Sequence, residues 1–172
     1  MNKLMLPLCC SSKTDDVINN NTKKSKTFFP SNSFSNISWE NTTPFKPNIS
    51  YGKVIKVYDG DTITIAAKPY REEPVFRFTL RLLNVDCPEI RSKDENEKKA
   101  AIIVRDKLKD LIYNKCVSIT DISSDKYGRV LCNVWLDNCN ISNWLLSNNL
   151  AVKYDGRKKE VPENWLTYIN KK

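Results

Sequence analysis

The order of hydrophobic periods after residue 51 constrains the fold most. Apolar and polar residues first alternate with the two-residue period of strands, and a helical period of about 3.6 residues follows. The expected strands are 53–58, 62–67, 75–85, 116–120 and 130–136, and the expected helices are 96–114, 141–146 and 162–169. Three strands, a helix, two strands and a helix predict an α+β, mainly β protein: an OB-fold, a five-stranded β-barrel with about three packed helices.

The first 50 residues differ in character from the rest. They are rich in Asn, Ser, Thr and Lys, they are interrupted by prolines, and they keep no lasting hydrophobic period. We therefore expect a disordered tail at 1–50 and one domain at 51–172.

Two adjacent cysteines, Cys9 and Cys10, follow a short apolar stretch in this tail. Acylation of the pair would attach the protein to a membrane. An untethered start and a cytoplasmic location are favoured, and membrane association through this pair is the alternative. The six cysteines form no C-x-x-C pair, and Cys116 and Cys132 are expected to be small buried hydrophobic residues.

The net charge and the absence of histidine limit the partners and the reactions that this chain can have. The net charge of +8 favours polyanionic partners, although positive charge can also serve solubility alone. The chain has no histidine, which excludes Ser–His and Cys–His nucleophilic pairs and histidine-containing zinc sites. Hydrolytic chemistry would have to use carboxylates, Arg, Lys or Tyr, together with a metal that prefers oxygen ligands.

Three polar segments carry residues of that kind: D-G-D-T at 59–62, R-L-L-N-V-D-C-P-E at 81–89 and D-K-Y-G-R at 125–129. Taken singly, the first and third are typical of ordinary turns. Taken together, they supply carboxylate oxygens for Ca²⁺, which takes about 6–8 oxygen ligands. They also supply arginines that can clamp a phosphate and a further carboxylate that can orient or deprotonate water.

These segments, in this order, resemble the staphylococcal nuclease family over about residues 51–155. The resemblance implies a calcium-dependent nuclease that hydrolyses phosphodiester bonds of DNA and/or RNA with little sequence specificity. It implies that Asp61 and Asp86 are carboxylate ligands of calcium and that the backbone carbonyl of Cys87 is a further ligand. Glu89 would act as general base on the attacking water or would position it, and Asp59 would lie behind the calcium ligands.

The same resemblance assigns substrate contacts. Arg81 and Arg129 would bind the phosphate and stabilise the transition state. Lys126 and Tyr127 resemble residues that contact a terminal phosphate, and Tyr154 resembles a tyrosine beneath a nucleotide base. The chain departs from the family pattern in having cysteine at 87 in place of threonine, a shorter segment at 91–98 and a basic stretch at 155–159.

Two other functions stay open. The same fold also occurs as catalytically inactive modules that bind nucleic acid or protein, and a membrane-tethered scaffold with an inactive barrel is the second possibility. The nuclease reading is favoured because Asp61, Arg81, Asp86, Glu89 and Arg129 are all present. We expect a monomer whose partner is its nucleic acid substrate, with no required protein partner.

Overall fold

The structure is a computed structural model, and it describes residues 34–72, 74–157 and 160–171. The chain divides into two compact units, Met1–Thr42 and Thr43–Lys172. In the described part of the first unit, two turns are closed by backbone hydrogen bonds from Ile37 to Phe34 and from Thr42 to Trp39. The predicted boundary at residue 50 stays a prediction, and Cys9 and Cys10 lie outside the described residues.

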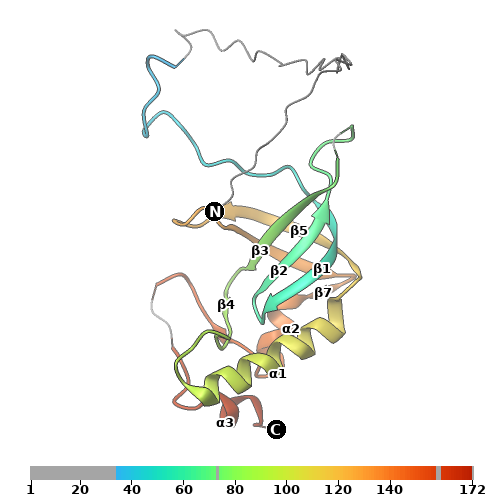
Figure 1. Cartoon of the computed structure of the whole chain (residues 1–172), viewed down its shortest axis with the longest axis vertical. Helices are drawn as coiled ribbons and strands as arrows, with labels where there is room; N and C mark the ends of the chain where they lie inside the picture. Colours follow the sequence, from blue (N-terminus) through green and yellow to red (C-terminus); the bar gives the residue numbers. More distant parts are fainter. Residues whose placement is uncertain (1–33, 73, 158–159, 172) are drawn as a thin grey trace, which may run out of the picture. The chain divides into compact units, whose positions relative to one another are not determined.

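Five strands of the second unit close into a β-barrel, which confirms the predicted OB-fold (Figure 1). β1 lies between β2 and β5, β2 pairs with β3, and β5 pairs with β6, all antiparallel. β3 and β6 then pair in parallel and close the barrel. The strands are β1 (Tyr51–Asp59), β2 (Thr62–Ala67), β3 (Phe76–Leu82), β5 (Cys116–Ser124) and β6 (Val130–Leu136).

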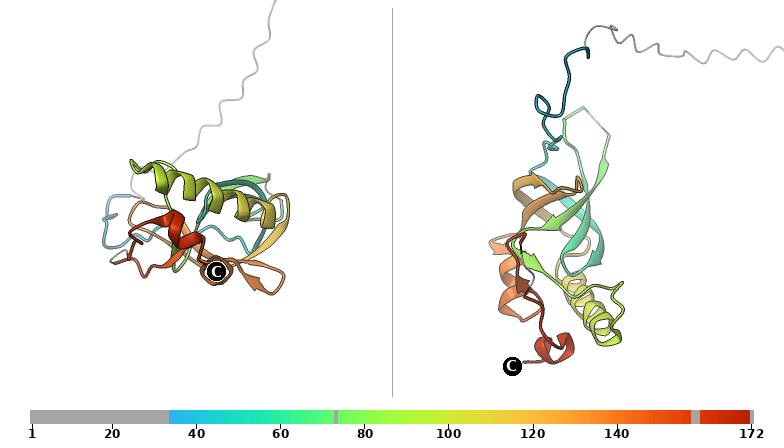
Figure 2. Two further views of the ribbon diagram at one scale, coloured as in Figure 1. Left: turned by 90° about the horizontal axis from the view of Figure 1, so that it is seen from below. Right: turned by 90° about the vertical axis from the view of Figure 1, so that its left-hand side faces the viewer.

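Three helices lie toward one end of the barrel (Figure 1 and Figure 2). α1 packs against β1 and α3, and its buried face is apolar and includes Val104, Leu108 and Ile112. None of the helices among the described residues is both long and apolar enough to cross a membrane. The helices are α1 (Glu95–Ile112), α2 (Ile141–Ser147) and α3 (Trp165–Ile169).

The long apolar run predicted as one strand at 75–85 divides into two strands. β3 ends at Leu82, and Asn84 takes a left-handed conformation with φ of 64°, which asparagine tolerates better than most residues. The chain resumes as the short strand β4 (Val85–Asp86), which pairs with β8 (Val152–Lys153). A third short strand, β7 (Cys139–Asn140), pairs with β6.

Two local predictions are wrong. The last helix does not begin at Pro162, because its N-cap is Asn164, whose side chain accepts a hydrogen bond from the backbone of Thr167. Cys116 is exposed, since it lies at the start of β5 with its side chain directed away from the core, whereas Cys132 is buried as expected.

Candidate active site

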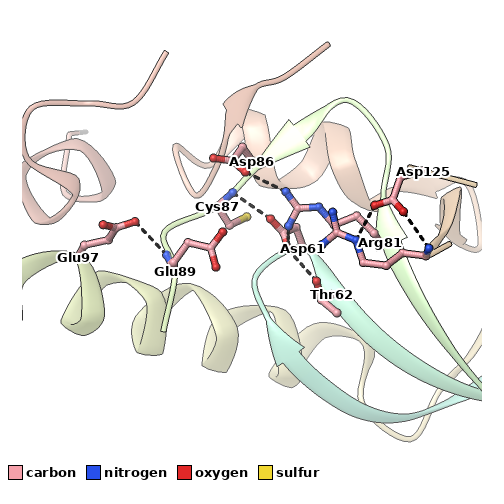
Figure 3. A network of polar contacts seen from close by, with 9 residues as sticks. Asp61, Thr62, Arg81, Asp86, Cys87, Glu89, Glu97 and Asp125 are labelled. Carbon is pink, nitrogen blue, oxygen red and sulfur yellow. Dashed lines mark hydrogen bonds and ion pairs between the residues drawn. The ribbon is translucent and has the colours of Figure 1, made fainter. Parts of the chain in front are cut away.

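Three segments of the chain bring Asp61, Arg81 and Asp86 together (Figure 3). Asp61 belongs to the turn between β1 and β2, Arg81 to the end of β3, and Asp86 to β4. The Arg81 guanidinium lies between the two carboxylates, with its Nη1 against Asp61 Oδ1 and its Nη2 2.8 Å from Asp86 Oδ1. Both aspartates are 2% exposed, so this is a buried cluster of two anions and one cation.

The strand register explains how Arg81 reaches this position. Leu80 and Leu82 are buried in the barrel, and alternation along a strand therefore directs Arg81 outward. Arg81 stands opposite Thr62 in the β2–β3 pair, and the backbone N–H of Leu82 donates to the carbonyl of Asp61 over 2.8 Å. The turn that carries Asp61 is thus fixed beside Arg81 by backbone hydrogen bonds.

Asp61 is held by two further donors. The Thr62 hydroxyl donates to Asp61 Oδ1 over 2.9 Å, and the Cys87 backbone N–H donates to Oδ2 over 3.1 Å. Burial nevertheless raises the pKa of Asp61, because Arg81 and these donors offset the loss of solvation only in part. Burial opposes the charge of Arg81 as well, but the two carboxylates outweigh it and raise the pKa of the guanidinium.

Asp59 lies at the end of β1, beside this cluster. Its Oδ1 is buried and has no hydrogen-bond partner among the described residues. Burial, and then the negative charges of Asp61 and Glu89, raise the pKa of Asp59 to about 6. A buried carboxylate oxygen without a donor is unfavourable, and a cation close to it would remove that penalty.

The donor chemistry fits Ca²⁺. Asp59, Asp61 and Asp86 offer carboxylate oxygens, which hard cations prefer. Cys87 fits as a backbone ligand only: burial raises the pKa of its thiol well above the ordinary value, so the sulfur is a neutral thiol. Within the described ranges, no three acidic or cysteine side chains converge as a ready metal-ligating group, and Arg81 is the cation between the two aspartates.

Glu89 lies in the loop between β4 and α1, with its side chain on the same side as Asp61 and Cys87 (Figure 3). A helix residue that sequence reasoning missed fixes this loop. Glu97 Oε1 accepts from the Glu89 backbone N–H over 3.1 Å, and Glu97 Oε2 accepts from the Ser92 hydroxyl over 2.5 Å. The sequence does mark Glu97, because it stands three residues after the helix N-cap Asp94, which is the spacing of a capping box.

The loop between β5 and β6 carries Arg129, Lys126 and Tyr127. Arg129 Nε lies 2.6 Å from Asp125 Oδ2, and the backbone N–H groups of Tyr127 and Arg129 donate to the other oxygen of Asp125. Partial burial raises the pKa of Asp125, but Arg129 and the backbone donors outweigh it, so the pKa is lowered. In the structure Arg129 thus forms its ion pair with Asp125 on the same loop. The Tyr127 ring is exposed, and its centroid lies 5.1 Å from Lys126 Nζ and 5.6 Å from Arg129 Cζ.

Tyr154 follows β8 directly, and its backbone N–H donates to the carbonyl of Asn84 over 3.2 Å. It lines a cavity of about 610 Å³ together with Asn84, Asn143 and Arg157. Because β8 pairs with β4, Tyr154 stands beside the turn that delivers Asp86.

Comparison with known proteins shows the family of the chain. The model of the staphylococcal nuclease homologue family matches residues 79–170, and the chain belongs to this family. An uncharacterized endonuclease of Escherichia coli is 31% identical over 108 residues, which are 61% of this chain and 61% of the relative. An uncharacterized endonuclease of Haemophilus influenzae is 30% identical over 102 residues, 59% of this chain and 51% of the relative. The protein ParB of Escherichia coli is 29% identical over 86 residues, 50% of this chain and 42% of the relative. The aligned stretches thus span between four-tenths and six-tenths of the length of these curated relatives.

Proposed function

We propose that this protein is a calcium-dependent nuclease that hydrolyses phosphodiester bonds of DNA and/or RNA with little sequence preference. The observation that carries the proposal is the guanidinium of Arg81, held between the buried carboxylates of Asp61 and Asp86. An arginine fixed by two acids beside a third, Asp59, is an unfavourable use of a protein interior unless the charges serve a reaction. The two relatives named as endonucleases support the same reading.

The calcium ion would be held by Asp61, Asp86 and the Cys87 carbonyl, with Asp59 behind them. When bound there, calcium supplies a positive charge that polarises a phosphoryl oxygen and neutralises charge that develops in the transition state. Release of Arg81 from one or both aspartates would leave its planar donors for two oxygens of the same phosphate.

Glu89 would orient the attacking water or accept its proton. Its backbone is fixed by Glu97, so the carboxylate is presented from a defined loop next to the cluster. Arg129 would approach the phosphate from the β5–β6 loop after leaving Asp125, and Lys126 and Tyr127 would contact a terminal phosphate. Tyr154 would lie under a base, and such contacts with phosphates and base faces give little sequence preference.

The test is cleavage of single-stranded DNA, duplex DNA and RNA by the full chain, with calcium or with chelator. Glu89→Gln should lower the cleavage rate by about 10²- to 10⁴-fold, as loss of a general base does. Glu163→Gln, an exposed carboxylate outside the cluster, is the matched control and should cleave like the wild type. Nucleic acid binding without any calcium-dependent cleavage would instead make the protein a binding module.

A further inference from the structure

A groove of about 560 Å³ lies between β1 and α1. We name it the β1–α1 groove, and the side chains that define it are apolar, aromatic or cationic: Ile55, Lys56, Tyr58, Arg105, Lys109 and Tyr113. It starts beside the candidate active site, because Tyr58 precedes Asp59 in the chain and Ile90, which also lines the groove, follows Glu89.

A β-bulge brings the cationic and aromatic side chains of β1 to this surface. Val54 pairs with Ile65 and Lys56 with Thr64, so Ile55 is an extra residue on β1. The bulge shifts the alternation: Val54 and Val57 are both buried, and Lys56 and Tyr58 both lie on the outer side. If β1 alternated regularly through Ile55, with no bulge, Lys56 would share the inward side with Val54.

Three of the cations at this surface have no acidic partner among the described residues. Lys56 Nζ lies 5.4 Å and Arg91 Cζ 5.8 Å from the Tyr58 ring centroid, and Lys109 Nζ lies 5.6 Å from that of Tyr113. In the described part of the chain, none of these three cations forms an ion pair, and no carboxylate lines the groove. Arg105 is different, because Asp106 neutralises it at 2.8 Å.

We propose that the β1–α1 groove binds a single-stranded stretch of the nucleic acid, next to the bond that is cleaved. Phosphates would lie along Lys56 and Lys109, and an unpaired base would stack on Tyr113, whose side chain is 48% exposed. Cationic grooves with aromatic platforms are how OB-folds bind single strands, and stacking requires a base that is free of a partner strand. This inference rests on the proposed nuclease function and names the form of its substrate.

The test measures binding of a fluorescein-labelled 12-nucleotide single-stranded DNA to the full chain. Fluorescence anisotropy is recorded in chelator, so that no cleavage interferes, over a series of salt concentrations. The logarithm of the association constant falls as the logarithm of the salt concentration rises. Lys109→Glu and Lys56→Glu should each make this slope less steep by about 0.7, the value for one phosphate contact on a single strand. Lys107→Glu is the matched control: it is exposed on the same helix, about 200° around the axis from Lys109, and should leave the slope unchanged.

Base stacking is tested separately at Tyr113. Tyr113→Ala should weaken single-strand binding by about 5- to 150-fold, while Tyr113→Phe, which keeps the ring, should bind like the wild type. A 12-base-pair duplex should show the lysine effects but not the Tyr113 effect. Lys56→Gln and Lys109→Gln repeat the charge test with milder substitutions if a reversal prevents folding.

The outcomes separate this inference from the proposed function, because calcium-dependent cleavage by the same wild-type preparation is measured alongside. If the wild type cleaves but Lys109→Glu and Lys107→Glu bind the single strand with the same salt dependence, the proposed role of the groove is wrong and the proposed nuclease function is unaffected. If Tyr113→Ala weakens the binding of duplex and of single-stranded DNA by the same factor, a base does not stack on Tyr113. Absence of cleavage by the wild type would overturn the proposed function, on which the groove's role depends.

Discussion

Replacement of Arg81 by methionine tests the charge arrangement of the candidate active site. Methionine keeps most of the side chain's apolar volume but removes the cation that lies between Asp61 and Asp86. Both carboxylates are 2% exposed, so neither can recover its solvation by turning to water. Removal of one partner from a buried ion pair destabilises proteins by about 3–5 kcal/mol, and we expect a loss of that size in calcium-free protein.

Urea unfolding in chelator at pH 7 measures this loss through tryptophan fluorescence, to which the buried Trp165 contributes. Arg105→Met is the matched control, because Arg105 pairs with the exposed Asp106 on the surface of α1. An exposed pair contributes about 0–1 kcal/mol, so the control should unfold at nearly the wild-type urea concentration.

Two further measurements on Arg81→Met test the same charge arrangement. Calcium should stabilise Arg81→Met more than the wild type, because the ion would neutralise carboxylates that have lost their cation. The loss should also shrink as the pH falls toward 4, since protonation removes the buried negative charges. A destabilisation below about 1 kcal/mol at pH 7, or equal calcium stabilisation of variant and wild type, would refute the reasoning.

Three other changes probe the site. Asp59 has a pKa raised from 3.8 to about 6, so its contribution to calcium-free stability is fully present below pH 3.8 and is lost as the pH rises through 6. Asp59→Asn should remove that part of the pH dependence in urea titrations, and an unchanged profile would contradict the assignment. Gly60→Ala should destabilise the protein by about 1–3 kcal/mol in urea unfolding, because the added Cβ would lie 2.5 Å from Val104 Cγ1 and 2.8 Å from Cys87 Sγ. Glu97→Ala, which removes the acceptor of the Glu89 backbone N–H, should lower kcat by about 10- to 100-fold through misplacement of Glu89, whereas Glu95→Ala on the same helix turn should not. Equal kcat values for the two variants would argue against this role.

The barrel could be predicted because its strands and its longest helix carry clear periods. The residues at which strands and helices end were harder to predict from the sequence. β5 continues to Ser124, past the predicted end at Thr120, because its polar last residues pair with β6 through backbone hydrogen bonds that leave no hydrophobic pattern. The bulge at Ile55 was equally hidden, since an apolar residue inserted between Val54 and Val57 looks like ordinary strand sequence.

The candidate site was predictable at the level of motifs, because Asp61 belongs to one polar segment and Arg81 and Asp86 to another, and the structure brings the two segments into contact. That Arg81 lies between both aspartates depends on the left-handed turn at Asn84, which redirects the chain after β3. Spacing alone does not reveal such a turn inside an apolar run. The roles of all the candidate site residues stay predictions. Glu97 acts through a hydrogen bond to the Glu89 backbone across eight residues, a partner that its capping-box spacing after Asp94 does not specify.

The most direct test of the central claim is the rate of single-stranded DNA cleavage as a function of calcium concentration, for wild type and Asp86→Asn. Lys107→Glu, outside the cluster, serves as the control. The arrangement of Asp61, Arg81 and Asp86 predicts saturable activation by calcium in the wild type and control, with activity abolished by chelator. It predicts that Asp86→Asn loses cleavage while remaining folded by circular dichroism. Cleavage that persists in chelator, or an Asp86→Asn protein with wild-type calcium activation, would contradict the account.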